Sequence, residues 1–137
     1  MTVVIDASVA IKWFVPENLR EEALGVLRTE NHIAAPDLLI PDLANLALEK
    51  VRRNEITGLK AGTILSGIES SGLELMPAFD VCERALEIAR TLDRSVYDCF
   101  YIAAAEQLDT VFITANVRLC TALCDTGLDG VVRALSS

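Results

Sequence analysis

Val3-Val4-Ile5-Asp6-Ala7-Ser8 is the stretch that decides the fold of this 137-residue chain. Three consecutive β-branched residues predict a strand that is buried on both faces, as in a parallel sheet covered by helices. Asp6 follows this strand directly, and open α/β sheets bind their ligands just beyond the carboxyl ends of the strands. Asp6 is therefore a candidate site residue, although an aspartate at this junction is also a common N-cap of the following helix.

Short apolar segments alternate with helical periodicity along the rest of the chain. We predict further strands near residues 32–35, 72–77, 110–114 and 130–133, and helices over 7–14, 18–30, 38–53, 58–70, 80–91, 95–108 and 116–124. Thr57, Asp80 and Ser95 are the predicted N-caps of three of these helices. This alternation predicts an α/β fold with a mostly parallel central sheet and helices on both faces. With no repeat or linker in the sequence, we expect one domain over residues 1–137.

The chain is acidic, with a formal net charge of −8. This charge argues against a broad nucleic-acid-coating surface, but it allows a local site in which metal ions neutralise carboxylates, and it favours a basic protein partner. No apolar stretch reaches the ~18 residues of a membrane span and no signal peptide is visible, so we expect a cytoplasmic protein without membrane contact. The four cysteines form no CxxC pair, and we expect reduced, mostly buried thiols.

Two helices carry further candidate acids. Asp42, Asn45 and Glu49 are spaced to share one stripe of the 38–53 helix, which is typical of a site or of a solvated face. Asp98 lies in a helix that is apolar nearly all round, where a carboxylate removed from water needs a cation or a cleft as partner. The alternative for Asp98 is a capping box with Ser95.

Thr114-Ala115-Asn116 ends a later strand and occupies the same geometric position as Asp6, with an amide in place of an acid. Together, Asp6, Asp42 and Asp98 would crowd negative charge at one edge of the sheet, which is unfavourable unless it is compensated. Oxygen-only clusters suit Mg²⁺ or Mn²⁺. The chemistry expected of such a site is phosphodiester hydrolysis by metal-activated water.

Four blocks of sequence resemble the PIN-domain family, and among its members most closely the VapC-type toxins of toxin–antitoxin pairs. They are V-V-I-D-A-S-V-A-I-K-W-F at 3–14, P-x-x-x-x-P-D-x-A-N at 36–45, S-V-Y-D-C-F-Y-I-A-A-A-E at 95–106 and F-I-T-A-N-x-R-L at 112–119. Each block is weak alone, but all four fall in the family's order. The resemblance implies a PIN-like α/β/α sandwich and a Mg²⁺- or Mn²⁺-dependent endoribonuclease that hydrolyses RNA. It also implies a homodimer held inactive by a small antitoxin that inserts basic side chains into the acidic pocket.

The resemblance also assigns site residues. The family's metal-binding acids fall on Asp6, Asp42, Asp98 and Asn116, and its supporting polar positions fall on Ser8, Asn45 and Thr114. Two of these positions depart from the family pattern. Asp42 is one methylene shorter than the usual glutamate and could ligate through water, and Asn116 lacks the negative charge of the usual acid. We therefore expect weaker metal binding than in a four-acid site.

Other functions remain open at this point. One is a PIN-like module that has lost catalysis at Asn116 and mainly binds an antitoxin or RNA. Another is an aspartyl-phosphate phosphatase or receiver domain that uses Asp6, although Ser8 stands where a phosphatase would be expected to carry a second acid. The basic residues available for RNA contact are Lys50, Arg52 and Arg53, with Lys12 and Arg118 nearer the predicted site, and solvated helix faces are the alternative explanation for most of them.

Overall fold

A five-stranded, fully parallel sheet forms the centre of the molecule in the computed structural model, which describes residues 2–30 and 32–136. The strand order is β3-β2-β1-β4-β5, so the first strand lies in the middle. The strands are β1 (Thr2–Ile5), β2 (His32–Pro36), β3 (Glu74–Met76), β4 (Phe112–Thr114) and β5 (Val132–Ala134). The predicted parallel α/β sheet is confirmed.

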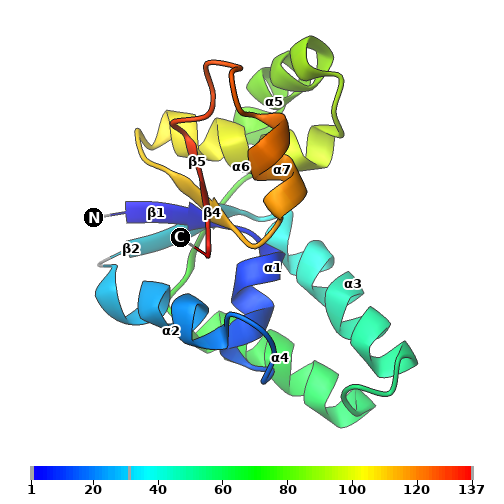
Figure 1. Ribbon diagram of the computed structural model, residues 1–137. Helices are drawn as coiled ribbons and strands as arrows, with labels where there is room; N and C mark the ends of the chain where they lie inside the picture. The colour runs from blue at the N-terminus through cyan, green and yellow to red at the C-terminus, as the bar shows by residue number, and fades with distance from the viewer. Residues whose placement is uncertain (1, 31, 137) are drawn as a thin grey trace.

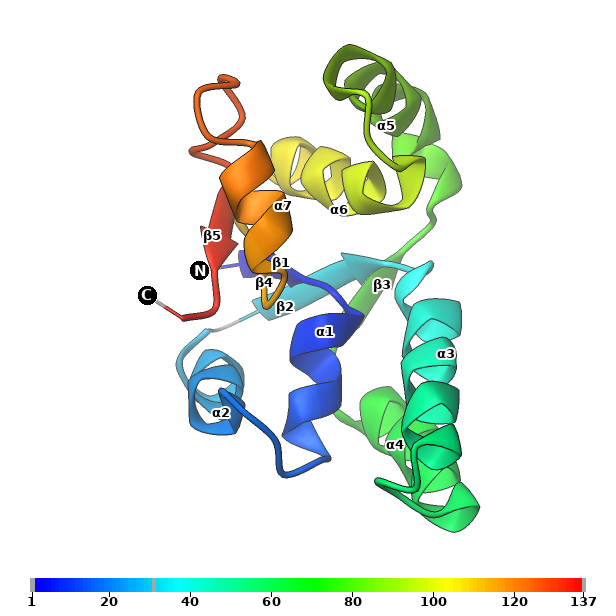
Figure 2. The same ribbon diagram turned by 45° about the vertical axis from the view of Figure 1, so that its right-hand side comes forward.

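Helices cover both faces of this sheet. In Figures 1 and 2, α5 and α6 lie on one side, and α1, α2, α3 and α4 lie on the other. The helical elements are α1 (Ala7–Ala10), the 3₁₀ turn η1 (Ile11–Trp13), α2 (Arg20–Thr29), α3 (Leu39–Arg52), α4 (Gly58–Ser70), α5 (Phe79–Leu92), α6 (Val96–Gln107) and α7 (Val117–Ala122). This arrangement is consistent with an α/β/α sandwich.

The apolar opening of the chain explains why β1 is central. Val3, Val4 and Ile5 are completely buried, and their strand pairs with β2 on one side and β4 on the other. A strand with neighbours on both edges and helices on both faces has no polar environment to face, so an uninterrupted apolar run suits it.

Helix α6 has more buried residues than any other helix of the described chain. Tyr101 to Ala105 are all buried, and the helix contacts β1, β2 and β4 as well as α5. Its alanines allow the helix to approach the sheet closely, and this burial carries the first turn of α6, with Asp98, to the carboxyl ends of the central strands.

An internal ion-pair cluster joins the segment after η1 to α3. The Glu17 carboxylate accepts a 3.0 Å hydrogen bond from Lys12 Nζ, and Lys50 Nζ of α3 binds its other oxygen. All three side chains are at most 23% exposed. Helix α4 is held nearby by Phe14, whose ring lies so close to Gly67 that a side chain there would collide with it.

Some predictions of local structure were wrong. Asp80 is not an N-cap, because α5 begins at Phe79 and Ala78 occupies the cap position, leaving Asp80 within the first turn. The cysteines are free but not mostly buried: Cys99 is buried, Cys120 is intermediate, and Cys82 and Cys124 are exposed on the surface of the molecule. Within residues 2–30 and 32–136, no helix has both the length and the apolarity to cross a membrane.

Candidate active site

Asp6 lies between the end of β1 and the start of α1, at the carboxyl edge of the sheet. Its Oδ1 accepts a 2.6 Å hydrogen bond from Ser8 Oγ and a 3.3 Å hydrogen bond from the Val9 amide. Its Oδ2 accepts a 2.6 Å hydrogen bond from Thr114 Oγ1 at the end of β4. Asp6 is therefore the N-cap of α1, as one of the two alternatives predicted, and it also stands at the carboxyl end of β1.

The surroundings of Asp6 raise the pKa of its carboxyl group above the ordinary value of 3.8. Burial is the largest cause, because it penalises the charged form. Hydrogen bonds from Ser8, Thr114 and Val9 act in the opposite direction, while the negative charge of Asp98 adds to the rise. Asp6 is thus a carboxylate kept at an electrostatic cost, which a bound cation would relieve.

A short hydrogen-bond network ties the ends of β1 and β4 together. Ser8 Oγ accepts the Ala115 amide at 3.1 Å, and Thr114 Oγ1 accepts the Asn116 amide at 3.1 Å. The Asn116 Oδ1 accepts the Leu119 amide at 3.2 Å and caps α7. The predicted residues Ser8, Thr114 and Asn116 therefore lie together with Asp6, but the carbonyl oxygen of Asn116 already serves as a helix cap.

Asp42 is in the first turn of α3 and is bound by a tyrosine of α6. The Tyr101 hydroxyl donates a 2.6 Å hydrogen bond to Asp42 Oδ2. Sequence reasoning missed Tyr101 as a site residue. The signal was present, because Tyr101 follows Asp98 by three residues and therefore lies on the same side of the helix.

All three predicted acids act on the pKa of Tyr101. Its pKa is raised far above the ordinary value of 10.0, first by burial and then by the hydrogen bond to Asp42. The negative charges of Asp42, Asp6 and Asp98 all contribute to the rise. The pKa of this one phenol thus depends on acids from three separate places: the end of β1, the start of α3 and the start of α6.

Asp98 is less buried than its apolar helix predicts. It lies in the first turn of α6 with its side chain 34% exposed, and its Oδ2 is 3.6 Å from Arg94 Nη2. The Asp98 carboxylate was predicted to be removed from water, but it is only partly buried, because the end of the helix reaches the surface. The partner within the chain is Arg94, whose Nε is buried and has no hydrogen-bond partner in the described structure. The capping box is incomplete: Ser95 accepts the Tyr97 amide, while Asp98 pairs with Arg94.

Several predicted residues make no hydrogen bond, within the described chain, to the acidic cluster of Asp6, Asp42 and Asp98. Asn45 is exposed on α3, and no hydrogen bond within the described chain links its side chain to the acids. Lys12 and Lys50 are engaged by Glu17 and are only 12% and 14% exposed, so they are poorly placed for RNA. Arg118 is exposed on α7, the helix that Asn116 caps.

The donor set fits a hard divalent cation that retains much of its water. All candidate ligands are carboxylate or amide oxygens, which Mg²⁺ and Mn²⁺ favour. In residues 2–30 and 32–136, no three Asp, Glu, His or Cys side chains lie close enough to enclose an ion. A cage built wholly of protein ligands is therefore not formed. Mg²⁺ commonly binds through one or two carboxylates plus water, and this cluster fits that mode.

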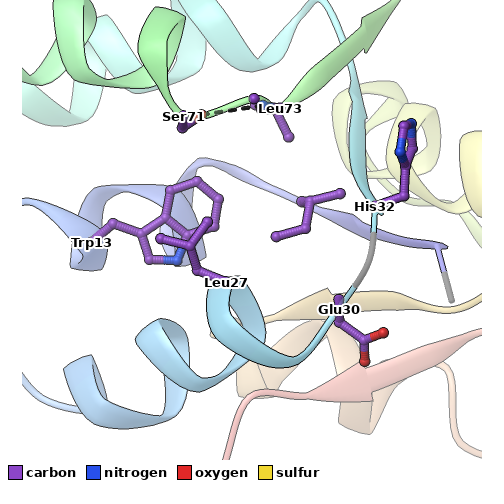
Figure 3. Close-up of a pocket in the computed structure, with 8 residues that line it drawn as sticks. Trp13, Leu27, Glu30, His32, Ser71 and Leu73 are labelled. Carbon is purple, nitrogen blue, oxygen red and sulfur yellow. Dashed lines mark hydrogen bonds between the residues drawn. The ribbon is translucent and has the colours of Figure 1, made fainter.

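A cavity elsewhere in the fold is separate from the acids. Figure 3 shows it between Trp13 of η1, Leu27 of α2, His32 at the start of β2 and Leu73 just before β3. It lies at the amino ends of these strands, the opposite edge of the sheet from Asp6, and none of the predicted site residues lines it. The acidic cluster remains the candidate for chemistry.

Comparison with known proteins shows the family and the fold of the chain. The family model described as PIN domain matches residues 3–122. Five solved chains also match. One is the crystal structure of PAE2754 from Pyrobaculum aerophilum, with a TM-score of 0.71, 18% sequence identity, and coverage of 98% of this chain and 84% of that chain. At this identity the likeness shows a shared fold alone. No curated protein matches the sequence.

Proposed function

Because the chain belongs to the PIN-domain family, we propose that it is a divalent-metal-dependent endoribonuclease with Asp6, Asp42 and Asp98 at its centre. PIN domains are in general metal-dependent nucleases, and this general activity is the starting point. The observation that carries the proposal is the convergence of the three acids around the Tyr101 hydroxyl, to whose raised pKa all three contribute. A buried carboxylate such as Asp6, whose pKa is raised in part by the charge of a second acid, is typical of a site completed by a cation.

The residues of the proposed site have different roles toward the ion. Asp6 and Asp98 would hold Mg²⁺ or Mn²⁺ most directly, and Asp42 would add its second carboxylate oxygen or bind through water. Ser8 and Thr114 orient Asp6 through their 2.6 Å hydrogen bonds. When bound, the ion would lower the pKa of water and stabilise negative charge on the phosphate.

The proposed substrate is RNA, attacked at a phosphodiester bond. A chain with a net charge of −8 repels a polyanion, so the cation would also compensate the charge of the phosphate. Arg94 is the basic residue that contacts a site acid, and Arg118 is exposed on the helix that follows Asn116. Both are candidates for contact with the RNA backbone.

We further propose that the protein is the toxin of a toxin–antitoxin pair and forms a homodimer. The acidity of the chain and of this site favours a small antitoxin that presents basic side chains. The homodimer is supported by exposed apolar side chains on α5, where Phe79 is 87% and Leu86 is 55% exposed. These two residues are seven apart and share one helix face, which is typical of an interface.

A binding-only module is the second candidate, and Asn116 is the observation that favours it. Its Oδ1 is engaged in capping α7, so the fourth position contributes neither a charge nor a free carbonyl oxygen. Titration with Mn²⁺ separates the two functions. A binding-only module would show little site-specific metal affinity and no RNA cleavage.

Cleavage of RNA by the purified protein, with Mg²⁺ or Mn²⁺ and with chelator, tests the proposal. We expect cleavage that depends on the ion and is abolished by chelator. Asp98→Asn keeps the size of the side chain but removes its charge, so it should lower the rate at least tenfold. Activity that persists in chelator, or that is equal in Asp98→Asn, would contradict the mechanism.

A further inference from the structure

Tyr101 connects two elements that carry separate acids of the proposed site. It belongs to α6, as Asp98 does, and its hydroxyl donates a 2.6 Å hydrogen bond to Asp42 Oδ2 on α3. The two residues are 59 positions apart in sequence. In the described chain, no other hydrogen bond to the Asp42 carboxylate is found, so Tyr101 is its main anchor.

The ring of Tyr101 is itself held firmly. Its side chain is only 4% exposed, and it stacks on Phe112 of β4 with ring centroids 5.4 Å apart and an interplanar angle of 17°. Phe112 is completely buried in the sheet. Because the core fixes the ring, the hydroxyl has one position, and from it the hydroxyl donates to Asp42.

The chemistry of the phenol restricts what it does there. A tyrosine phenol has an ordinary pKa of about 10 and is protonated throughout the physiological range, and here its hydroxyl donates to Asp42 Oδ2. A phenol that does not ionise is neither a general base nor a nucleophile. It is a fixed hydrogen-bond donor.

We propose that Tyr101 is a positioning residue that holds one oxygen of Asp42 so that the other, Oδ1, is directed to the cation. The inference rests on the proposed function, because it assumes that Asp42 contributes to a metal site. Asp42 has a shorter side chain than a glutamate would have, so its contribution depends strongly on the direction of its carboxylate. Removing a residue that hydrogen-bonds to a metal ligand and orients it commonly lowers metal affinity about 10- to 100-fold.

The test is Mn²⁺ affinity measured by calorimetry, together with thermal unfolding in chelator. Tyr101→Phe removes the hydroxyl and keeps the ring on Phe112. We expect it to weaken Mn²⁺ binding at least tenfold. Tyr97→Phe is the matched control, since Tyr97 is on the same helix with its side chain 61% exposed. The Mn²⁺ affinity of this variant should equal that of the unmodified protein.

A second pair of variants separates positioning from packing. If Tyr101 acts through Asp42, then Tyr101→Phe should have no further effect on Mn²⁺ affinity in an Asp42→Asn background. Equal loss in both backgrounds would assign Tyr101 a packing role and overturn the proposal. A Tyr101→Phe protein that is unfolded in chelator at 25 °C would overturn it in the same way.

Asp98→Asn distinguishes failure of this inference from failure of the proposed function. If Asp98→Asn weakens Mn²⁺ binding and Tyr101→Phe does not, the metal site stands and the role of Tyr101 is wrong. If Asp98→Asn leaves Mn²⁺ binding unchanged, the proposed metal site fails, and the role of Tyr101 fails with it.

Discussion

Thr114 donates a 2.6 Å hydrogen bond to Asp6 although 108 residues separate them in the sequence. Thr114 is completely buried. It ends β4, Asp6 follows β1, and the two strands are parallel neighbours. The bond therefore fixes the carboxylate at the edge of the sheet and partly offsets the cost of burying its charge.

Replacing Asp6 by asparagine should stabilise the protein in the absence of metal. Well below pH 3.8 the carboxyl group is protonated in both the folded and the unfolded state. As the pH rises, the Asp6 carboxyl group of the unfolded state loses its proton first, so the free energy of unfolding of the unmodified protein falls. The fall ends once the pH has passed the raised pKa of Asp6 in the folded state. Asparagine has no proton to lose, so its advantage should grow over this window and then level off.

Urea unfolding of Asp6→Asn in chelator between pH 3 and 8 measures this effect. We expect a gain of about 0.5–3 kcal/mol at pH 7, with a smaller gain at pH 3. Asp129→Asn, a change at an exposed aspartate, is the control and should differ from the unmodified protein by no more than about 0.5 kcal/mol. A loss of stability for Asp6→Asn that is constant with pH would show that the cost of burying the charge does not outweigh the hydrogen bonds that the carboxylate accepts.

Glu17→Gln should destabilise the fold, because Lys12 would be left partly buried without a counter-charge and Lys50 would keep only the more distant, exposed Glu55. Burial alone would raise the pKa of Glu17, but the hydrogen bonds from Lys50 and Lys12 outweigh burial and lower it below 4.5. The stabilisation is therefore present above pH 4.5 and is lost as the pH falls through the lowered pKa. We expect a loss of about 1–3 kcal/mol in the free energy of unfolding at pH 7.

Glu55→Gln is the control for this cluster, since Glu55 is 47% exposed and lies 3.9 Å from Lys50. Its loss should not exceed about 0.5 kcal/mol. Equal losses for the two variants would mean that the Lys12–Glu17–Lys50 contacts contribute no more than an exposed pair.

Arg94→Gln should strengthen Mn²⁺ binding in the absence of RNA. Arg94 Nη2 lies 3.6 Å from Asp98 Oδ2, so its positive charge competes with a cation for this carboxylate. The pair is partly exposed, and its removal should change affinity by about two- to fivefold. Calorimetry measures the change, with Arg90→Gln on the exposed surface of α5 as the comparison. Weaker Mn²⁺ binding by Arg94→Gln would show that the arginine supports the acids instead of competing with the ion.

Asn116→Asp should increase both Mn²⁺ affinity and nuclease activity. The aspartate retains an oxygen able to accept the Leu119 amide, so α7 keeps its cap, and the site gains one negative charge. We expect a several-fold rise in affinity, with stability in chelator equal or lower because like charges lie close together. Unchanged affinity and activity would mean that residue 116 faces its helix and not the cation.

The sheet and most helices were predictable because their signals are local. The run Val3-Val4-Ile5 is apolar on both faces and predicts a central strand, and Thr57 and Ser95 are N-caps as predicted. The PIN resemblance, carried by short motifs around acids and strand ends, is confirmed by the match over residues 3–122. Asp80 failed as a cap because α5 starts two residues earlier than its pattern indicates.

The features of the site that escaped prediction all depend on tertiary contacts. Nothing in the sequence pairs Tyr101 with Asp42, because α6 and α3 lie on opposite sides of the sheet and the two side chains meet only in the folded chain. The ion pairs of Lys12 and Lys50 with Glu17 also form only in the folded chain. They leave both lysines poorly placed for the RNA contact that the sequence suggested. The exposure of Asp98 depends on where the apolar helix reaches the surface.

Mn²⁺-dependent cleavage of single-stranded RNA, compared between Asp6→Asn and Asp129→Asn, tests the central claim most directly. Both changes remove one carboxylate charge, one within the acidic cluster and one on the exposed surface. We predict that Asp6→Asn loses at least ~99% of the cleavage rate while remaining folded, and that Asp129→Asn retains the full rate. Equal rates for the two variants, or cleavage that needs no divalent ion, would contradict the assignment of a metal-dependent nuclease to these acids.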